Sequence, residues 1–251
     1  MELAEIWRYP VKSMLGEQVD EAAVGPDGIR GDRQWAVVDV ASGVSLSAKR
    51  YAALLHCRAW TRDGQVMVGL PDGRAYPAGC DVVARELTEL LGRQVTMRTA
   101  DATEPIRHEF PTAVTEGEGE PFLWQPGTNA FFDSSTLHLL TTGTLAQLRR
   151  LMPGSVIHQA RFRPNFLVVT DETGFVEHGW IDKNVTLGSL RCRVTGHTRR
   201  CVMVTRDQGD LPRDVQVIRT IVQQNEGRAG VAMEALASAL LRRGAEVSVD
   251  D

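Results

Sequence analysis

Short runs of alternating apolar and polar residues, separated by turn residues, fill the first part of the chain. Such runs are typical of half-buried β-strands, because successive side chains of a strand point to opposite faces. The dipeptides Asp63-Gly64 and Asp72-Gly73 are of the kind that reverses the chain in a hairpin. The strands that this pattern predicts are residues 2–9, 18–24, 34–40, 56–61 and 94–98.

One helix is expected among these strands, over residues 81–91. Its apolar side chains recur at the spacing of a single helix face. Asp81 can cap its first turn, and Gly92 can end it in the left-handed conformation. The strands on either side of this helix have the spacing of a β-barrel or a β-sandwich.

The periodic pattern stops between residues 101 and 135. Within this stretch Thr115–Pro121 and Gln125–Gly127 show neither a helical nor a strand period. We interpret residues 101–135 as a linker or flap. The segment from Glu109 to Ser135 is too long for an ordinary connection, so we expect a mobile or irregular flap beside a functional cleft.

Residues 136–251 again predict a mostly β unit. Its expected strands are residues 137–140, 166–170, 185–195, 202–205, 229–235 and 246–249, and its expected helices are residues 145–152 and 215–222. We therefore predict a mostly β fold with a few helices, in which residues 1–100 and residues 136–251 form two domains joined by residues 101–135.

Composition and charge narrow the class of protein. The 251 residues are 43% hydrophobic and 24% charged, which is enough for one large domain or two small ones with apolar cores. A formal net charge of -4 argues against a surface that grips nucleic acid by neutralising phosphates. The chain starts without a basic and then apolar leader, and no run approaches the roughly 18 apolar residues of a membrane span. We expect a cytoplasmic protein.

The four cysteines are spaced as single thiols. Cys57, Cys80, Cys192 and Cys201 form no C-x-x-C pair, so neither a zinc site nor an iron–sulfur cluster is predicted. A chain of this length in a reducing compartment is expected to keep them free, most of them as buried apolar residues.

Two polar segments near the start of the chain carry candidate chemistry. Lys12 and Ser13 directly follow the first predicted strand, and an ammonium beside a hydroxyl suits a phosphate or another oxyanion. Arg30 and Arg33 lie in a glycine-bearing turn, and the arginine fork binds oxyanions by paired hydrogen bonds. The pattern also allows Lys12 to be an exposed turn lysine, and Asp32 to brace a neighbouring arginine.

A third polar segment, Arg161–Asn165, stands at the entrance of a predicted strand. Its proline fixes the backbone, so that Arg163 and Asn165 leave the strand entrance at a defined angle. Asn165 has the alternative role of satisfying turn backbone, which is common for asparagine.

The fourth polar segment contains Cys201 directly after Arg199 and Arg200. Two cations beside a thiol favour the thiolate, which is the form that attacks or binds a metal. The alternative is a plain core cysteine before an apolar strand. A weaker feature is Thr141–Thr144, where helix N–H groups and hydroxyls can seat an anion, although ordinary capping by Thr144 also explains it.

Taken together, these segments resemble a known family. Tyr-Pro-Val-Lys-Ser, Gly-Asp-Arg-x-Trp, Arg-Phe-Arg-Pro-Asn and Arg-Cys-Val-Met-x-Thr, in this order, are similar to the MOSC (molybdenum cofactor sulfurase C-terminal) family and its N-terminal β-barrel partner. The resemblance runs from Leu3 to about Val247. Within the family the pattern is similar to the mitochondrial amidoxime-reducing component and its bacterial counterparts.

The resemblance implies a fold, a cofactor and a reaction. It implies a MOSC β-barrel domain after a smaller N-terminal β-barrel or α+β domain, and a molybdenum–molybdopterin cofactor with which N-hydroxylated compounds are reduced. Cys201 then corresponds to the metal ligand and catalytic residue. The positions that correspond to residues holding the pterin and its phosphate are Lys12, Ser13, Arg33, Arg163, Asn165 and Arg200, with Thr141 as a further hydroxyl contact.

The chain also departs from the family pattern. After Cys201 many relatives continue through Val-Asp-Pro-x-Thr-Gly, whereas this chain has Arg206–Asp210, so its substrate-side segment differs. Some bacterial relatives carry a fused plant-type ferredoxin whose cysteine run is absent from this sequence. The resemblance therefore implies a separate electron-donor protein of the ferredoxin, flavodoxin or flavin reductase type.

Two other functions remain open at the level of sequence. The protein could carry sulfur as a persulfide on Cys201, or store and deliver the cofactor without reducing a substrate. It could also be a scaffold that keeps the fold and binds some other anion.

Overall fold

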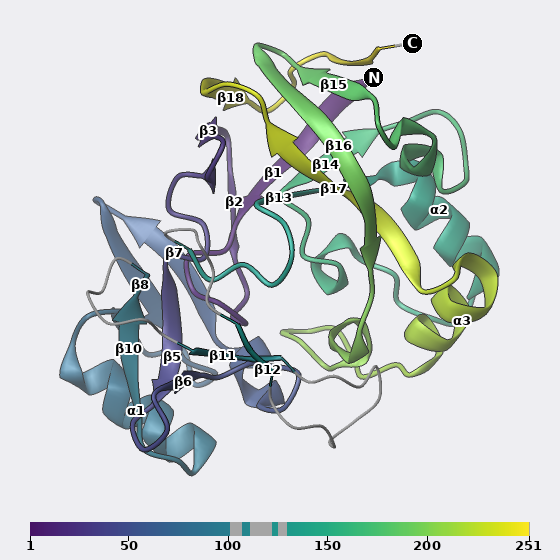
Figure 1. Ribbon diagram of the computed structural model, residues 1–251. Coiled ribbons are helices and arrows are strands. Elements are labelled where there is room, and N and C mark those ends of the chain that lie inside the picture. Colours follow the sequence, from purple (N-terminus) through teal and green to yellow (C-terminus); the bar gives the residue numbers. More distant parts are fainter. Residues whose placement is uncertain (101–106, 111–121, 125–129, 251) are drawn as a thin grey trace.

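The computed structural model describes residues 1–100, 107–110, 122–124 and 130–250 (Figure 1). The predicted mostly β fold is confirmed, with strands throughout and helices α1 (Asp81–Leu91), α2 (Thr142–Leu151) and α3 (Gln216–Asn225). In the first half the strands are β1 (Glu2–Arg8), β2 (Glu17–Val19), β3 (Glu21–Gly25), β4 (Gly28–Ile29), β5 (Trp35–Asp39), β6 (Val44–Ser45), β7 (Arg58–Arg62), β8 (Gln65–Gly69), β9 (Ala75–Pro77), β10 (Val95–Thr99), β11 (Arg107–Phe110) and β12 (Phe122–Trp124). In the second half they are β13 (Leu137–Thr141), β14 (Phe166–Val169), β15 (Asn184–Leu187), β16 (Leu190–Arg199), β17 (Arg228–Ala235), β18 (Ala239–Arg242) and β19 (Val247–Val249).

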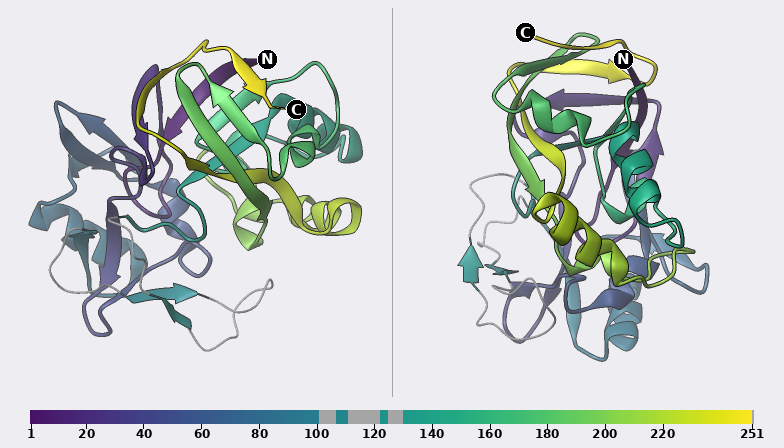
Figure 2. Two further views of the ribbon diagram at one scale, coloured as in Figure 1. Left: turned by 45° about the horizontal axis from the view of Figure 1, so that its top comes forward. Right: turned by 90° about the vertical axis from the view of Figure 1, so that its right-hand side faces the viewer.

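The largest sheet has eight strands in the order β19-β15-β16-β17-β13-β14-β1-β2. Its pairs are antiparallel except for β13 and β14, which run parallel. The sheet curls back on itself at the chain ends, since Glu2 forms an isolated bridge with Glu246 and Leu3 N donates to Ala245 O at 2.9 Å. This contact brings β1 next to the start of β19, as both views in Figure 2 allow the reader to follow.

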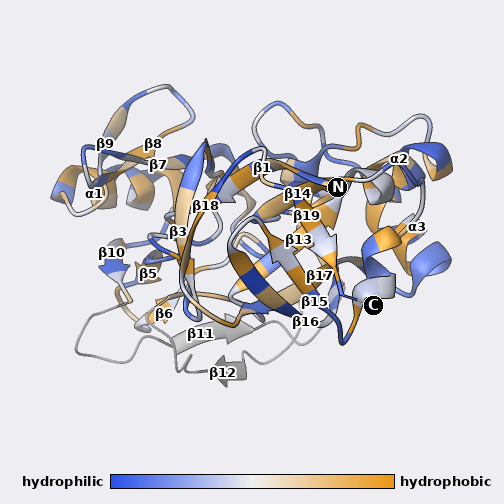
Figure 3. Ribbon diagram, turned by 90° about the horizontal axis from the view of Figure 1, so that it is seen from above, coloured by the Kyte–Doolittle hydropathy of each residue, from blue (hydrophilic) through white to orange (hydrophobic). Residues whose placement is uncertain are grey.

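Apolar side chains pack on both faces of this sheet. On one face Leu139, Phe166 and Val231 belong to a buried core inside the curled sheet. On the other face Leu140 and Leu167 pack under α2 and α3. Strand β13 is therefore buried on both faces, which explains why leucines occupy three of its five positions (Figure 3).

The first half of the chain builds a second core around β5, β10 and the hairpin β7–β8–β9. Helix α1 covers it with Val83 and Leu87, both fully buried. Strand β1, however, lies in the large sheet beside β14. The division of the chain into domains at residues 100 and 135 stays a prediction.

Local sequence signals located several elements closely. Helix α1 has the predicted bounds and ends at Gly92 in the left-handed conformation, with φ 62°, although Cys80 and not Asp81 takes the N-cap position. Asp63 and Gly64 turn the hairpin between β7 and β8 with φ of 50° and 77°. These features depend on neighbouring residues, which is why sequence patterns locate them.

Other expectations were wrong in detail. Residues 202–205 form a 3₁₀ turn, η4 (Val202–Thr205), in place of a strand, because Val204 N donates to Cys201 O at 3.3 Å and Thr205 Oγ1 donates to Val202 O at 2.7 Å. The single strand expected over 185–195 is the hairpin β15–β16, turned at Gly188 with φ 58°. The strand expected over 18–24 is divided into β2 and β3.

The remaining short 3₁₀ turns are η1 (Ala52–His56), η2 (Gln159–Arg161) and η3 (Val176–Trp180). Among the helices in the described ranges, none is both long and apolar enough to cross a membrane. The flap expected over Glu109–Ser135 lies largely outside the described residues; its described parts are the end of β11, strand β12 and the residues from 130 onward.

Candidate functional site

The segment Arg161–Asn165 lies at the centre of the polar contacts, between η2 and the first residue of β14. Arg163 has a left-handed backbone, with φ 54°. Its Nη1 donates to Met14 O at 2.6 Å, and its guanidinium lies 4.3 Å from the centre of the Tyr9 ring. Burial lowers the pKa of Arg163 to about 10, so the side chain remains a cation at neutral pH. The loop after β1 is thus fixed to a segment from the other half of the chain.

Arg33 approaches the same place from the loop before β5. Its backbone is also left-handed, with φ 51°, and its guanidinium lies 4.5 Å from the Tyr9 ring centre. One nitrogen forms an ion pair with Asp32 and another donates to Arg163 O at 3.4 Å. Two guanidinium groups therefore share one aromatic ring, which is a favourable place for a desolvated cation.

Tyr9 is itself held as a neutral phenol. Its hydroxyl donates to Pro164 O at 3.1 Å, and burial raises the pKa of Tyr9 far above its ordinary value. Its amide donates to Asp32 Oδ1 at 2.7 Å. We call Tyr9, Asp32, Arg33 and Arg163 the arginine cluster.

Within the arginine cluster, Asp32 is the shared acceptor, and Asn165 connects it to the neighbouring backbone. Asp32 is buried, and it accepts from Tyr9 N, from Arg33 and from Asn165 Nδ2, the last at 3.0 Å. Asn165 Nδ2 also donates to Trp7 O at 3.2 Å, and Asn165 Oδ1 accepts from His138 N at 3.2 Å. Both alternatives left open by the sequence are thus found: Asp32 pairs with Arg33, and Asn165 satisfies backbone.

Lys12 and Ser13 lie in the loop after β1, and Phe131 connects Lys12 to Arg33. The Lys12 ammonium is buried, pairs with Asp133 and donates to Phe131 O at 3.3 Å. Burial lowers the pKa of Lys12. Lys12 is therefore not the exposed turn lysine that the sequence allowed. Ser13 has φ 68°, and its Oγ accepts from Ala48 N at 3.0 Å.

Asp133 bridges two lysines, since Lys49 Nζ lies 3.2 Å from its Oδ2. Burial by itself raises the pKa of Asp133, but the two ammonium groups hold it well below its ordinary value. Asp133 was not among the residues singled out from the sequence, and nothing in its local pattern distinguishes it from an ordinary loop aspartate.

Arg200 is a cation, and each of its three guanidinium nitrogens donates a hydrogen bond to a neutral acceptor. Its Nε donates to Ala229 O at 2.8 Å, its Nη1 to Phe162 O at 2.9 Å, and its Nη2 to His138 Nε2. Burial lowers the pKa of Arg200 to about 10, while the neighbouring Cys201 favours the charged form. Among the described residues no carboxylate lies within ion-pair distance of Arg200 or Arg163.

His138, on β13, connects Arg200 to the arginine cluster. Because a guanidinium only donates hydrogen bonds, His138 Nε2 must accept, which places the ring proton on Nδ1, facing Arg163 O at 3.4 Å. Burial and then the Arg200 charge hold the pKa of His138 well below its ordinary value. His138 was missed from the sequence; the one available signal is a polar residue inside an otherwise apolar strand.

Cys201 differs from the core cysteines. It is partly exposed, follows β16 and caps the start of η4 with an extended backbone. Cys57 and Cys192 are fully buried, and burial raises the pKa of each to about 12. All four cysteines are free, as expected. Cys201 is thus placed beside the Arg200 cation and outside the apolar core.

Thr141 lies in a different environment. Its Oγ1 accepts from Thr144 N at 3.1 Å and donates to Glu177 Oε2 at 2.6 Å, so Thr141 and not Thr144 caps α2. Glu177 also accepts from Thr144 Oγ1 and from Gly230 N. Burial raises the pKa of Glu177 against the opposing effect of the threonine hydroxyls. Glu177 was also missed by the sequence analysis.

The structure therefore brings most of the predicted residues together by a chain of contacts. Arg33, Arg163 and Asn165 belong to one hydrogen-bonded network, and Phe131 N, donating to Arg33 O at 2.7 Å, connects it to Lys12. Arg200 joins this network through His138. Thr141 belongs to the separate network of Glu177.

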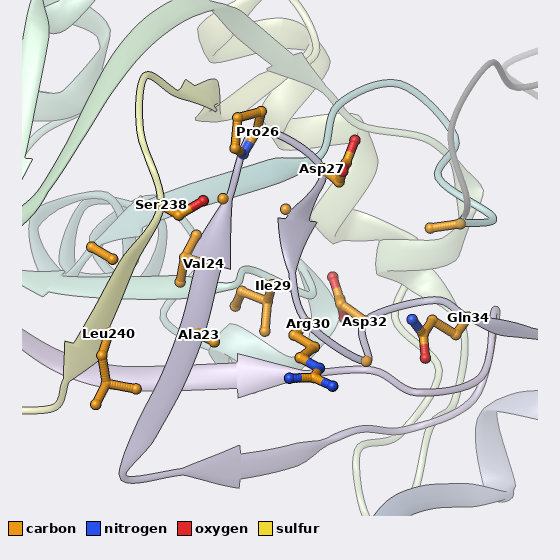
Figure 4. A pocket seen from close by; sticks show the side chains of 15 residues that line it. Ala23, Val24, Pro26, Asp27, Ile29, Arg30, Asp32, Gln34, Ser238 and Leu240 are labelled. Carbon is orange, nitrogen blue, oxygen red and sulfur yellow. The ribbon is translucent and has the colours of Figure 1, made fainter.

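A hollow of about 570 Å³ lies beside the network (Figure 4). It is lined by β3, β4, the start of the loop after β4 and β18, with Arg30, Asp32 and Ser238 among its polar residues. Cys201 and Arg163 do not line it. Arg30 thus faces this hollow and is not part of the arginine cluster.

Comparison with known proteins supports the resemblance. The model of the MOSC N-terminal β-barrel domain matches residues 1–110, and that of the MOSC domain matches residues 126–248. The molybdenum cofactor sulfurase of Drosophila erecta is 23% identical over 88% of this chain and 29% of its own length. The human mitochondrial amidoxime-reducing component 1 is 24% identical over 82% of this chain and 66% of its own length. The chain thus spans less than a third of the sulfurase.

Among solved structures, the YuaD protein of Bacillus subtilis aligns over 99% of this chain and 94% of its own, with 10% identity and a TM-score of 0.46. The two family models together extend over most of the sequence, in the order that the four polar segments predict. The chain belongs to the MOSC family.

Proposed function

We propose that this protein is a molybdenum-cofactor-dependent reductase that removes oxygen from N-hydroxylated compounds, with Cys201 as the metal ligand. The observation that carries the proposal is the pair Arg200 and Cys201. A buried cation with only neutral hydrogen-bond acceptors stands beside a partly exposed thiol. Sulfur is a preferred ligand of a soft metal, and a neighbouring cation suits an anionic cofactor.

The wider charge distribution fits an anionic ligand. Lys12, Lys49, Arg33, Arg163 and Arg200 stand against the carboxylates Asp32 and Asp133 in a protein whose formal net charge is -4. Local positive charge in an acidic protein is a means of selecting one anionic ligand. A pterin with a phosphate group has the required charge.

In this proposal the residues have separate roles. Arg163, Arg33 and Lys12 would hold the phosphate, Ser13 and Asn165 would hold the pterin, and Arg200 would offset the negative charge beside Cys201. Lys12 would share its ammonium between the phosphate and Asp133. Thr141 contributes only if its contact with Glu177 is exchanged for one with the cofactor.

When bound, the molybdenum cofactor supplies the two-electron chemistry that breaks the N–O bond of a small substrate. The protein holds the thiolate of Cys201 in place, keeps positive charge around the anionic ligand and shields both in a partly buried site. Electrons come from a separate donor protein of the ferredoxin, flavodoxin or flavin reductase type. The amidoxime-reducing name of the human relative supports this reaction class.

A second function is favoured by a specific observation. The sulfurase relative matches over 88% of this chain, and a partly exposed thiol beside a cation also suits transfer of sulfur as a persulfide. In that case the protein would carry sulfur or the cofactor and reduce no substrate.

The deciding experiment is made on protein from a host that synthesises the cofactor. Molybdenum and pterin are quantified, and benzamidoxime reduction is measured with a chemical electron donor. Stoichiometric molybdenum with turnover supports the reductase. Bound cofactor without turnover, together with sulfur that is released from Cys201 by a reductant, supports the carrier instead.

A further inference from the structure

Arg161 is the most deeply buried arginine of the candidate site, and it contacts the residues that follow Cys201 in the sequence. It is 1% exposed. Its Nη1 donates to Val204 O and to Arg206 O, both at 3.3 Å, and its Nη2 donates to Pro212 O at 2.7 Å. Its Nε donates to Val156 O at 2.9 Å. Three of the four acceptors thus lie shortly after Cys201.

These three carbonyl groups belong to what we call the post-cysteine segment, residues 202–214. The segment closes on itself, since Gln208 and Leu211 exchange backbone hydrogen bonds of 3.0 Å and Asp214 N donates to Thr205 O at 2.8 Å. It is the stretch in which this chain departs from the usual family sequence. Hydrogen bonds that fix this segment therefore restrain the substrate side of the proposed site.

The post-cysteine segment also contacts the first half of the chain. Arg206 Nη2 donates to Lys49 O at 3.0 Å, Gly209 N donates to Leu55 O at 3.2 Å, and His56 Nε2 lies 2.9 Å from Asp207 Oδ2. The segment therefore has hydrogen bonds to two parts of the molecule, namely to the buried Arg161 and to residues 49–56.

The position of Cys201 depends on these contacts. On its N-terminal side, Arg200 is fixed by its guanidinium and by its amide, which donates to Gly227 O at 2.7 Å. On its C-terminal side, Cys201 O accepts from Val204 N in the first turn of η4. Arg161 holds the carbonyl of that same Val204. Without Arg161, the turn would lose its only side-chain anchor from the Arg161–Asn165 segment.

We propose that Arg161 is a positioning residue for the proposed reaction, which fixes the orientation of Cys201 by holding the carbonyl groups of Val204, Arg206 and Pro212. It acts through the post-cysteine segment and touches no reacting atom. The guanidinium fork is suited to the task because it presents several donors in fixed directions, which an ammonium group cannot reproduce. The inference rests on the proposed function in taking Cys201 as the metal ligand.

The test measures the thiol of Cys201 in protein that has never been loaded with cofactor. A Cys80→Ser background leaves Cys201 as the one cysteine that is not fully buried. The rate of alkylation of Cys201 by iodoacetamide is followed by mass spectrometry at one fixed pH. Arg161→Met and Arg161→Lys are compared with Arg149→Met, a matched control in which an exposed arginine loses its bonds to Ile157 O.

In both Arg161 variants we expect a several-fold rise in the rate of alkylation. The thiol becomes more accessible as the segment loosens. Amide exchange over residues 202–214 is expected to accelerate in parallel. Arg149→Met should match the parent protein in both measurements.

An unchanged rate of Cys201 alkylation in a folded Arg161→Lys protein, with unchanged exchange over residues 202–214, would overturn the role of Arg161. So would an equal change in Arg149→Met. If Arg161→Met does not fold, the lysine variant gives the decision. Because these measurements need no molybdenum, a lack of reductase activity in the loaded protein would count against the proposed function alone.

Discussion

Arg161 and Arg163 stand two positions apart and send their guanidinium groups to two different segments, Arg161 to Val204 O and Arg163 to Met14 O. Between them, Phe162 O accepts from Arg200. The left-handed backbone of Arg163, which costs a residue with a Cβ roughly 1–2 kcal/mol, turns the chain at this point. One short segment therefore connects the loop after β1, the residue before Cys201 and the segment after it.

The replacement Cys201→Ser should abolish reduction of N-hydroxylated substrates and leave the fold intact. A hydroxyl is nearly the size of a thiol but is a poor ligand for a metal that prefers thiolate. Activity of the molybdenum-loaded protein and circular dichroism are compared with those of Cys192→Ser. Cys192 is fully buried in the large sheet, so its replacement should cost about 1–3 kcal/mol of stability and keep activity. Full activity in Cys201→Ser would show that Cys201 is not the metal ligand.

The replacement Arg200→Met should weaken cofactor retention and raise the pKa of His138. The charge of Arg200 contributes to holding that pKa down, and its loss also frees His138 Nε2 to accept a proton. Molybdenum content after gel filtration and the NMR titration of the His138 ring are the two measurements. Burial still opposes protonation, so the pKa should rise toward its ordinary value without reaching it. A His138 titration identical to that of the parent would contradict the contact.

Sequence patterns located elements whose signals are local. Helix α1 and the turn at Asp63-Gly64 were predicted closely, because a helix face, a glycine C-cap and a hairpin dipeptide are each read within a few residues. Strand β18 was not predicted. It pairs with β3, which lies far away in the sequence, and no short window contains that information.

In the candidate site, too, residues with a local sequence signal were predicted, and residues defined by tertiary contacts were not. Arg33, Arg163 and Arg200 were found as charged residues beside turns and strands, where oxyanion sites commonly occur. Two other residues were missed, namely Asp133, the partner of Lys12, and His138, the partner of Arg200, because both contacts depend on tertiary packing.

The replacement Asp32→Asn should be strongly destabilising, by about 3–5 kcal/mol, because it removes the fully buried carboxylate that pairs with the partly buried Arg33. The new amide would also point a donor at Tyr9 N or at Asn165 Nδ2, both of which donate to Asp32. Urea unfolding gives the free energy. Asp63→Asn, at a 95% exposed side chain in a turn that accepts asparagine, is the control and should change stability by less than about 0.5 kcal/mol. Equal changes in the free energy of unfolding for Asp32→Asn and Asp63→Asn would mean that the contacts of Asp32 do not stabilise the fold.

Glu177 should make the protein less stable as the pH rises above the ordinary carboxyl value. Burial raises the pKa of Glu177 in the folded protein, so between the unfolded pKa, near 4.5, and the higher folded pKa the native state binds more protons than the unfolded chain. The free energy of unfolding therefore falls with increasing pH across that window, by about 1.4 kcal/mol for each unit of pKa difference. Glu177→Gln removes the titrating group, and its one amide oxygen can still accept from Thr141 and Thr144, which both donate to Oε2. Its NH2 group then faces Gly230 N, so the variant should be less stable at every pH, and only the slope with pH is compared. The variant should lose this slope in urea unfolding measured across pH, whereas Glu21→Gln, at a 57% exposed side chain, should retain it. A slope that survives in Glu177→Gln would place the titrating group elsewhere.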